Sequence, residues 1–140
     1  RGSTMRLRNL NRVVLGLMSL LILVGCQEEY KVELASAQET VESAIFTISD
    51  TDAERMTTVH TVRVYDQNEA LVWHLQRDAA VVDKGLERLS YGSAPMGFKV
   101  AVAAAPLERG ASYTLVVQGR GYGALRFAAS SAGILSSLKN

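Results

Sequence analysis

The sequence predicts an all-β protein, organised as a single small β-sandwich of about six to seven strands. Apolar and polar residues alternate with a period of two along several short segments, which is typical of strands that bury one face. Clusters of Gly, Pro, Ser and Asp separate these segments at intervals of about 8 to 12 residues, and no helical period is sustained. Short strands at this spacing favour a sandwich.

The clearest element is a hairpin in the segment TVHTVRVYDQNEALVWHLQ. Its polar centre predicts a turn with a two-residue tip at 67–68. Val64 is then expected to pair with Leu71. Val62 is expected to pair with Trp73, so that all four apolar side chains share one face. A slip by one residue would place polar against apolar side chains, so the pattern itself selects the face that is buried.

Further strands are expected on both sides of this hairpin. Each is a short run rich in β-branched, aromatic or small apolar residues that ends at turn residues. These strands are expected at residues 44–49, 98–104, 113–119 and 124–129, with weaker ones at 30–34 and 86–91. Residues 78–84 are compatible with a helical turn or a strand, and the pattern at the end of the chain is ambiguous.

One segment, LERGASYTLVV at residues 107–117, resembles the turn that enters strand F of fibronectin type III and immunoglobulin-like domains. In that family a Leu and a following Tyr form the tyrosine corner. The resemblance implies an immunoglobulin-like β-sandwich in which the ring of Tyr113 is buried and its hydroxyl bonds to upstream backbone. Trp73 stands at a different place from the family's core tryptophan, so it does not fix the strand order.

An export signal precedes the predicted domain. Residues 5–12, MRLRNLNR, carry three arginines and no acid, and residues 13–24 form an apolar run. This order is typical of a signal peptide. The run is too short for a membrane-spanning helix, which needs about 20 apolar residues. Residues 1–4 precede the natural start at Met5 and are set aside as a frame remnant, so the signal is assigned to residues 5–25.

The residues Leu23, Val24 and Gly25, followed by Cys26, resemble the bacterial lipobox. The resemblance implies that diacylglycerol is attached to the thiol of Cys26, that a peptidase cuts before this residue, and that the new amino terminus is acylated. Several acyl chains, palmitate among them, would anchor the protein stably, since one chain binds a membrane only marginally. Because Gln27 and not Asp follows the cysteine, the resemblance favours the outer membrane, with the domain facing the periplasm.

Removal of residues 1–25 leaves 115 residues with a formal net charge of −3. No thiol remains for a disulfide, so the stability of the domain must come from its core. The polar and acidic residues 26–42 are expected to form a flexible tether. The sandwich is assigned to residues 43–130, and residues 131–140 are assigned to a C-terminal tail.

The loop YGSAPMGF at residues 91–98 is the candidate interaction site. Its Tyr91, Met96 and Phe98 are able to form an adaptable apolar contact surface. The alternative is that these side chains hold the loop against the end of the sandwich.

Other motifs do not predict chemistry. His60 and His74 are the only histidines, and the expected hairpin places them on opposite faces, so no metal site is predicted. The G-x-G-x-x-A pattern at 119–124 is interpreted as a hairpin turn whose glycines adopt positive φ, because no acid follows for a dinucleotide ribose. The S-x-x-K match at Ser136 and Lys139 lies alone in the tail and is attributed to chance. No catalytic residue and no cofactor are predicted, and a net charge of −3 argues against nucleic acid.

The sequence therefore favours a lipid-anchored, non-enzymatic interaction or accessory module of the cell envelope, with another envelope protein as its partner. One alternative is a periplasmic lipoprotein subunit of a secretion apparatus. The segment VRVY at residues 62–65 and the overall architecture are similar to the small lipoproteins of type VI secretion. The other alternative is an envelope hydrolase acting on peptidoglycan or lipid, because such sites can assemble from residues distant in sequence.

Overall fold

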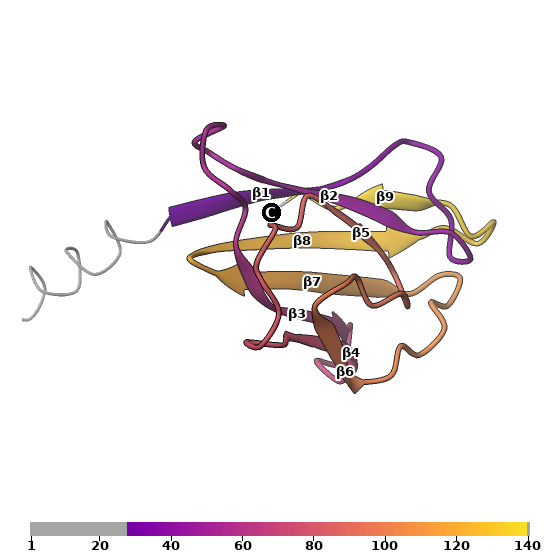
Figure 1. Ribbon diagram of the computed structural model, residues 1–140. Helices are drawn as coiled ribbons and strands as arrows, with labels where there is room; N and C mark the ends of the chain where they lie inside the picture. Colours follow the sequence, from indigo (N-terminus) through magenta and orange to yellow (C-terminus); the bar gives the residue numbers. More distant parts are fainter. Residues whose placement is uncertain (1–27, 140) are drawn as a thin grey trace, which may run out of the picture.

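The computed structural model describes residues 28–139 and shows an all-β protein, with no helix in that part of the chain (Figure 1). Nine strands are present in it, two or three more than the sequence predicts. They are β1 (Glu28–Leu34), β2 (Ile45–Asp50), β3 (Val59–Asp66), β4 (Leu71–Arg77), β5 (Arg88–Ser90), β6 (Phe98–Val102), β7 (Ser112–Gly119), β8 (Gly121–Ala129) and β9 (Leu135–Ser137). The strands from β1 to β8 lie where the sequence predicts strands, and β9 was not predicted.

The strands form one mixed sheet in the order β5-β2-β1-β8-β7-β3-β4-β6, with β9 also paired to β8. Strand β1 joins two parts of this sheet. Its first two residues, Glu28 and Glu29, pair in parallel with β8, and from Tyr30 to Leu34 it pairs antiparallel with β2. All other pairings between the strands are antiparallel.

The sheet curls around a single core. Tyr91, directly after β5, packs edge-on against Trp73 of β4, with ring centroids 4.9 Å apart. In a flat sheet β5 and β4 would be about 29 Å apart, because six strand spacings of about 4.8 Å separate them. Phe46 of β2 likewise contacts Phe127 of β8 at 5.3 Å. The layer β5-β2-β1 therefore faces the layer β8-β7-β3-β4 across the core.

The core consists of the inward-facing residues of these strands, as the period-2 pattern predicts. The largest fully buried side chains are Trp73, Phe46, Phe127, Ile48, Leu75, Leu89, Leu115, Leu135, Val59, Val62, Val64 and Val117. Since they come from β2, β3, β4, β5, β7, β8 and β9, the core ties together nearly every strand.

The predicted hairpin exists, but its predicted register is wrong by two residues. Val62 lies opposite Leu75 and Val64 lies opposite Trp73, with an irregularity before Tyr65. A shift of two residues preserves the face on which each side chain lies, so the predicted burial of Val62, Val64 and Trp73 is confirmed. Leu71, predicted on the same face, is instead exposed at the start of β4.

The register differs because the turn is longer than the two-residue tip expected. The carboxylate of Asp66 accepts hydrogen bonds from the N–H groups of Asn68 at 2.8 Å and Ala70 at 3.0 Å. Glu69 adopts a φ of 63°, which makes it the single non-glycine residue with positive φ among those described. An Asp at the start of a turn and a left-handed residue near its end are typical of a type I turn followed by a bulge.

The expected tether at 26–42 is wrong for the residues that the structure describes. Tyr30 and Val32 of β1 are buried, while Lys31 and Glu33 between them are exposed. The buried carboxylate of Glu39 accepts a hydrogen bond from the Ile45 N–H at 3.1 Å. The weak strand expected at residues 30–34 is therefore confirmed as part of β1, in which the acids Glu29 and Glu33 are exposed.

The expected C-terminal tail at 131–140 is also corrected, since β9 pairs with β8 and Leu135 belongs to the core. The segment SAGILSSLKN is too short and too polar to display a clear period, yet one buried leucine and one strand pairing are enough to order it. The folded domain thus extends over residues 28–139.

The expectation for Tyr113 is confirmed. Its side chain is buried, and its hydroxyl accepts a hydrogen bond from the N–H of Glu108 at 2.8 Å. Its ring stacks on Phe127 with centroids 5.5 Å apart. The hydroxyl thereby fixes the backbone turn that leads into β7, five residues upstream.

Tyr113→Phe is expected to lower the free energy of unfolding by about 1 kcal/mol, because it removes one partly buried hydrogen bond and leaves the ring in place. Urea unfolding followed by the fluorescence of Trp73, the one tryptophan of the chain, measures this change. As a control, Tyr122→Phe alters a half-exposed side chain and should change stability by less than about 0.5 kcal/mol. Equal stability of the two variants would contradict the role assigned to the Tyr113 hydroxyl.

Candidate interaction site

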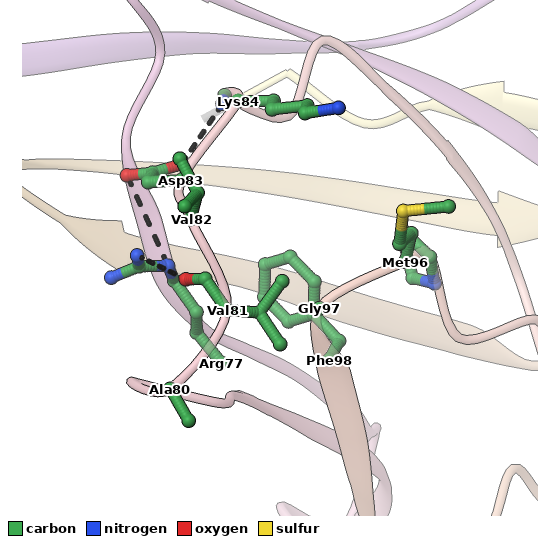
Figure 2. Close-up of a pocket in the computed structure, with 11 residues that line it drawn as sticks. Arg77, Ala80, Val81, Val82, Asp83, Lys84, Met96, Gly97 and Phe98 are labelled. Atoms are coloured by element: carbon green, nitrogen blue, oxygen red, sulfur yellow. Dashed lines mark hydrogen bonds and ion pairs between the residues drawn. The ribbon is translucent and has the colours of Figure 1, made fainter.

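The best-formed recess lies between the connection that follows β4 and the loop that leads into β6 (Figure 2). It is an open cleft of ≈ 560 Å³. One wall comes from residues 80–85, together with Arg77 at the end of β4. The other wall comes from residues 95–98. Two segments that are distant in sequence thus form a single concave surface.

The two walls are held together at Asp78. Its backbone N–H donates to the carbonyl oxygen of Gly97 at 2.7 Å, which joins the first wall to the second. Its carboxylate accepts the Ala80 N–H at 3.0 Å and lies 3.4 Å from the ammonium group of Lys99. The hydrogen bond from Ala80 and, less strongly, the charge of Lys99 hold the pKa of Asp78 below its usual value. Asp78 therefore remains ionised near neutral pH and shapes the rim of the cleft.

The guanidinium of Arg77 supports the first wall from within. It donates a hydrogen bond to the carbonyl oxygen of Val81 at 3.1 Å and lies 4.0 Å from the carboxylate of Asp83. Asp83 in turn accepts the N–H of Gly85 at 2.9 Å. These contacts, drawn as dashed lines in Figure 2, engage Arg77 and Asp83 with the loop itself, and Lys84 is the remaining charged residue of this wall.

The side chains that face the cleft are mainly apolar. Val81 points toward Phe98 across the cleft in Figure 2, and a Cβ placed on Gly97 would lie 3.3 Å from Val81. Val82 and Met96 are 79% and 87% exposed, respectively. Exposed apolar side chains beside a concave surface are typical of a contact site, and the flexible thioether of Met96 adapts to different shapes.

Of the three residues predicted for the interaction loop, the structure brings Met96 and Phe98 together at the cleft. Tyr91 is turned elsewhere, because its ring packs on Trp73 and its hydroxyl donates to the carbonyl oxygen of Ala105. Burial, and secondarily the nearby Tyr113, raise the pKa of Tyr91 to about 12. Tyr91 thus holds the loop against the core, which is the alternative role considered for these side chains.

Sequence reasoning missed the opposite wall. Residues 78–84 form a connection of turns rather than a helical turn or a strand. Two adjacent valines, Val81 and Val82, within a polar stretch were the signal that could have identified this segment, since such a pair needs either a core or a partner.

The two histidines are not brought together. His74 lies opposite Arg63 in the β3–β4 pair, three residues along β3 from His60. Burial, together with the positive charge of Arg63, lowers the pKa of His74 from 6.5. Its Nε2 atom is buried without a hydrogen-bond partner. Within residues 28–139 no three His, Cys, Asp or Glu side chains form a group able to hold a metal ion.

The glycine pattern at 119–124 lies in the β7–β8 hairpin, as expected. The reason given for its glycines is wrong, because neither Gly119 nor Gly123 adopts positive φ. They allow close approach instead. A Cβ on Gly119 would lie 1.9 Å from the carbonyl oxygen of Thr58, and one on Gly123 would lie 2.7 Å from that of Tyr30.

The remaining predicted residues do not form a site in the described part of the chain. Ser136 is exposed in β9 and pairs with Ala128, while Lys139 is exposed after the strand. Cys26 and the lipobox residues Leu23, Val24 and Gly25 lie outside the described residues.

No protein-family model matches this chain, and comparison with curated proteins and with solved structures gave no match either. Residues 28–139 include no helix with the length and apolarity that a membrane crossing requires. The fold and the cleft define a class of protein: a small all-β domain with a mainly apolar cleft formed by two loops.

Proposed function

We propose that this protein is a lipid-anchored component of the bacterial cell envelope, and that its all-β domain is a non-enzymatic interaction module facing the periplasm from the outer membrane. The observation that carries the proposal is the sequence around Cys26. A cationic segment, a short apolar run and the residues Leu23, Val24 and Gly25 all precede the only cysteine. Together they resemble the signal of a bacterial lipoprotein.

The nature of the cleft supports an interaction module. Arg77 and Asp83 bind the loop that carries them, so the groups left to meet a ligand are the apolar side chains of Val81, Met96 and Phe98 and the ammonium group of Lys84. Such a mainly apolar surface recognises another apolar surface, and its lining residues include no Ser, Thr, Cys or His.

We further propose that the fold is an immunoglobulin-like sandwich. Tyr113 stands at the start of β7, as the tyrosine corner stands at strand F of that family. Strand β7 has β8 and β3 as neighbours, as strand F has strands G and C, and β2 has β1 and β5, as strand B has strands A and E. In this assignment β4 and β6 extend one layer and β9 lies beside β8.

Cys26→Ser tests the anchor. Cells expressing this variant are expected to accumulate an uncleaved precursor that takes up no labelled palmitate, because the thiol is the site of acylation. Its extraction from the membrane fraction should also differ from that of the native protein. Gln27→Ser is the matched control, since it alters the next residue and leaves the thiol in place. Normal cleavage and labelling of Cys26→Ser would refute the proposal.

The two alternatives make different predictions with the native protein. A subunit of a secretion apparatus should co-purify with other subunits of that apparatus, and an envelope hydrolase should turn over peptidoglycan or lipid. No contact among the described residues favours either alternative over an interaction module.

A further inference from the structure

The strand directions place one set of connections at the end of the domain where β1 begins. Strands β1 and β8 start there, because their first residues pair in parallel. The antiparallel pairings then place the ends of β2, β4 and β7 and the starts of β3, β5 and β6 at this same end. The connections 51–58, 78–87 and 91–97 and the β7–β8 turn therefore meet at, or lead into, the anchor end of the sandwich.

Contacts between these connections confirm that they adjoin. The hydroxyl of Tyr30 in β1 donates to the carbonyl oxygen of Thr58 at 2.7 Å. A Cβ on Gly85 would lie 2.9 Å from the side chain of Met56, and one on Gly97 would lie 3.3 Å from that of Val81. The surface is thus continuous from the start of β1 to the cleft.

Most of the exposed large apolar side chains of the described residues lie at this end. We call them the anchor-end patch, and they are Met56, Val81, Val82, Met96 and Tyr122. At the opposite end the exposed apolar residues are separate, with Ile134 before β9 and Leu71 at the start of β4. An apolar surface concentrated at one end indicates a contact made by that end.

The distance to the lipid limits what can cover the patch. Only Gln27 separates Cys26 from Glu28, the first residue of β1. Two residues of extended chain span at most about 7 Å, and one polar headgroup layer is about 5–7 Å deep. If Cys26 carries the lipid, the anchor end is held at the depth of the headgroups.

We propose that the anchor-end patch lies against the bilayer to which Cys26 is attached, with Val82 and Met96 in contact with the lipid and Tyr122 at the headgroup level. This inference rests on the proposed function, since it requires acylation of Cys26. Tyr suits an interface because its ring is apolar and its hydroxyl is polar.

The contact is apolar rather than electrostatic. Two pairs of opposite charge lie beside the patch, with Arg55 3.3 Å from Asp52 and Arg77 4.0 Å from Asp83. The other charges in these connections are of both signs, Lys84 and Arg120 with Glu54 and Glu87. Pairing and the mixture of signs reduce the attraction for anionic lipids, and salt screens what remains. The contact is therefore expected to persist at high salt.

Single introduced cysteines test the contact. With its only native cysteine acylated, the full chain carries one free thiol in each of the variants Val82→Cys, Met96→Cys and Ile134→Cys. An environment-sensitive fluorophore is attached to each, and the purified proteins are inserted into vesicles of phosphatidylethanolamine and phosphatidylglycerol. The probes at 82 and 96 should show a blue-shifted emission and several-fold quenching by brominated lipid. The probe at 134, an exposed position at the far end, should show neither.

A second pair of variants distinguishes a loss of lipid contact from a change in folding. With the probe at position 96, Val82→Asp should return its emission toward the value in water, because a carboxylate resists contact with lipid, whereas Ile134→Asp should leave it unchanged. Both substitutions alter exposed side chains, so Trp73 fluorescence should report the native fold in each.

The possible failures are distinguishable. If the wild-type chain does not float with the vesicles, or its native thiol reacts with the probe, the proposed function fails. If the chain floats but the probes at 82 and 96 resemble the probe at 134, only the inference fails. It also fails if these probes are shielded in native envelope vesicles and exposed in pure lipid, because a protein would then cover the patch.

Discussion

Phe127→Ala should lower the free energy of unfolding by about 3–5 kcal/mol, the usual cost of deleting a fully buried phenylalanine. Phe127 is completely inaccessible in β8, with Phe46 of the opposite layer 5.3 Å away and Tyr113 of the neighbouring strand 5.5 Å away. Its ring therefore fills the space between the two layers of the curled sheet. A domain of this size has about 5–15 kcal/mol of stability, so the variant would lose a large part of it.

Urea unfolding followed by Trp73 fluorescence would measure this loss. Phe98→Ala is the matched control, because Phe98 is only partly buried beside the open cleft. Phe98→Ala should lower the free energy of unfolding clearly less than Phe127→Ala does, since less buried apolar surface is lost. If Phe127→Ala unfolds at a urea concentration equal to or higher than that for Phe98→Ala, the position of Phe127 in the core is contradicted.

Most of the strands could be predicted because the pattern of residues within each short segment is enough to indicate a strand. In β3, β4, β7 and β8 the buried and exposed positions alternate as their apolar and polar residues do. The burial of Tyr113 and its hydrogen bond to upstream backbone were also readable, because Tyr113 and the turn before it lie within one short segment. Local patterns predict local geometry.

The remaining parts depend on contacts that no local pattern displays. Strand β1 gave only a weak signal among its acids, and its place in the domain depends on the burial of Tyr30 and Val32 in the core. Strand β9 is ordered by pairing with β8 and by the burial of Leu135. The register of β3 with β4 was missed because it depends on how the carboxylate of Asp66 closes the turn.

One of the two walls of the candidate site was predicted from the sequence. Met96 and Phe98 were identified from their loop, while the facing wall depends on the hydrogen bond between Asp78 and Gly97, residues that are 19 positions apart. A single sequence contains no signal for such a pairing. The same holds for Tyr91, whose role was decided by the approach of Trp73 from the far side of the curled sheet.

Gly119 shows how a motif can be explained by packing alone. At the end of β7 it lies against the backbone that enters β3, and its missing side chain leaves room for the carbonyl oxygen of Thr58. That oxygen also accepts the hydroxyl of Tyr30, so three strands meet at this point. The glycine is required by the close approach of backbone, whereas a nucleotide site would require a helix that is missing from the described residues.

Gly119→Ala is therefore expected to destabilise the protein by about 3 kcal/mol or more, at or above the upper end of the usual cost of overpacking. The added Cβ would lie 1.9 Å from the Thr58 oxygen and 2.9 Å from the Cα of Val59, and neither backbone atom can move without disturbing the pairing of β3 with β7. Urea unfolding measures the loss, and amide hydrogen exchange in β3 should increase with it.

Gly110→Ala separates this clash from the general cost of replacing a glycine. Gly110 has a φ of 77° and no atom within 4 Å of the added Cβ, so its substitution introduces backbone strain without overlap. That strain is expected to cost about 1–2 kcal/mol. If Gly119→Ala destabilises the protein no more than Gly110→Ala does, the close approach at Thr58 is not what requires a glycine in this hairpin.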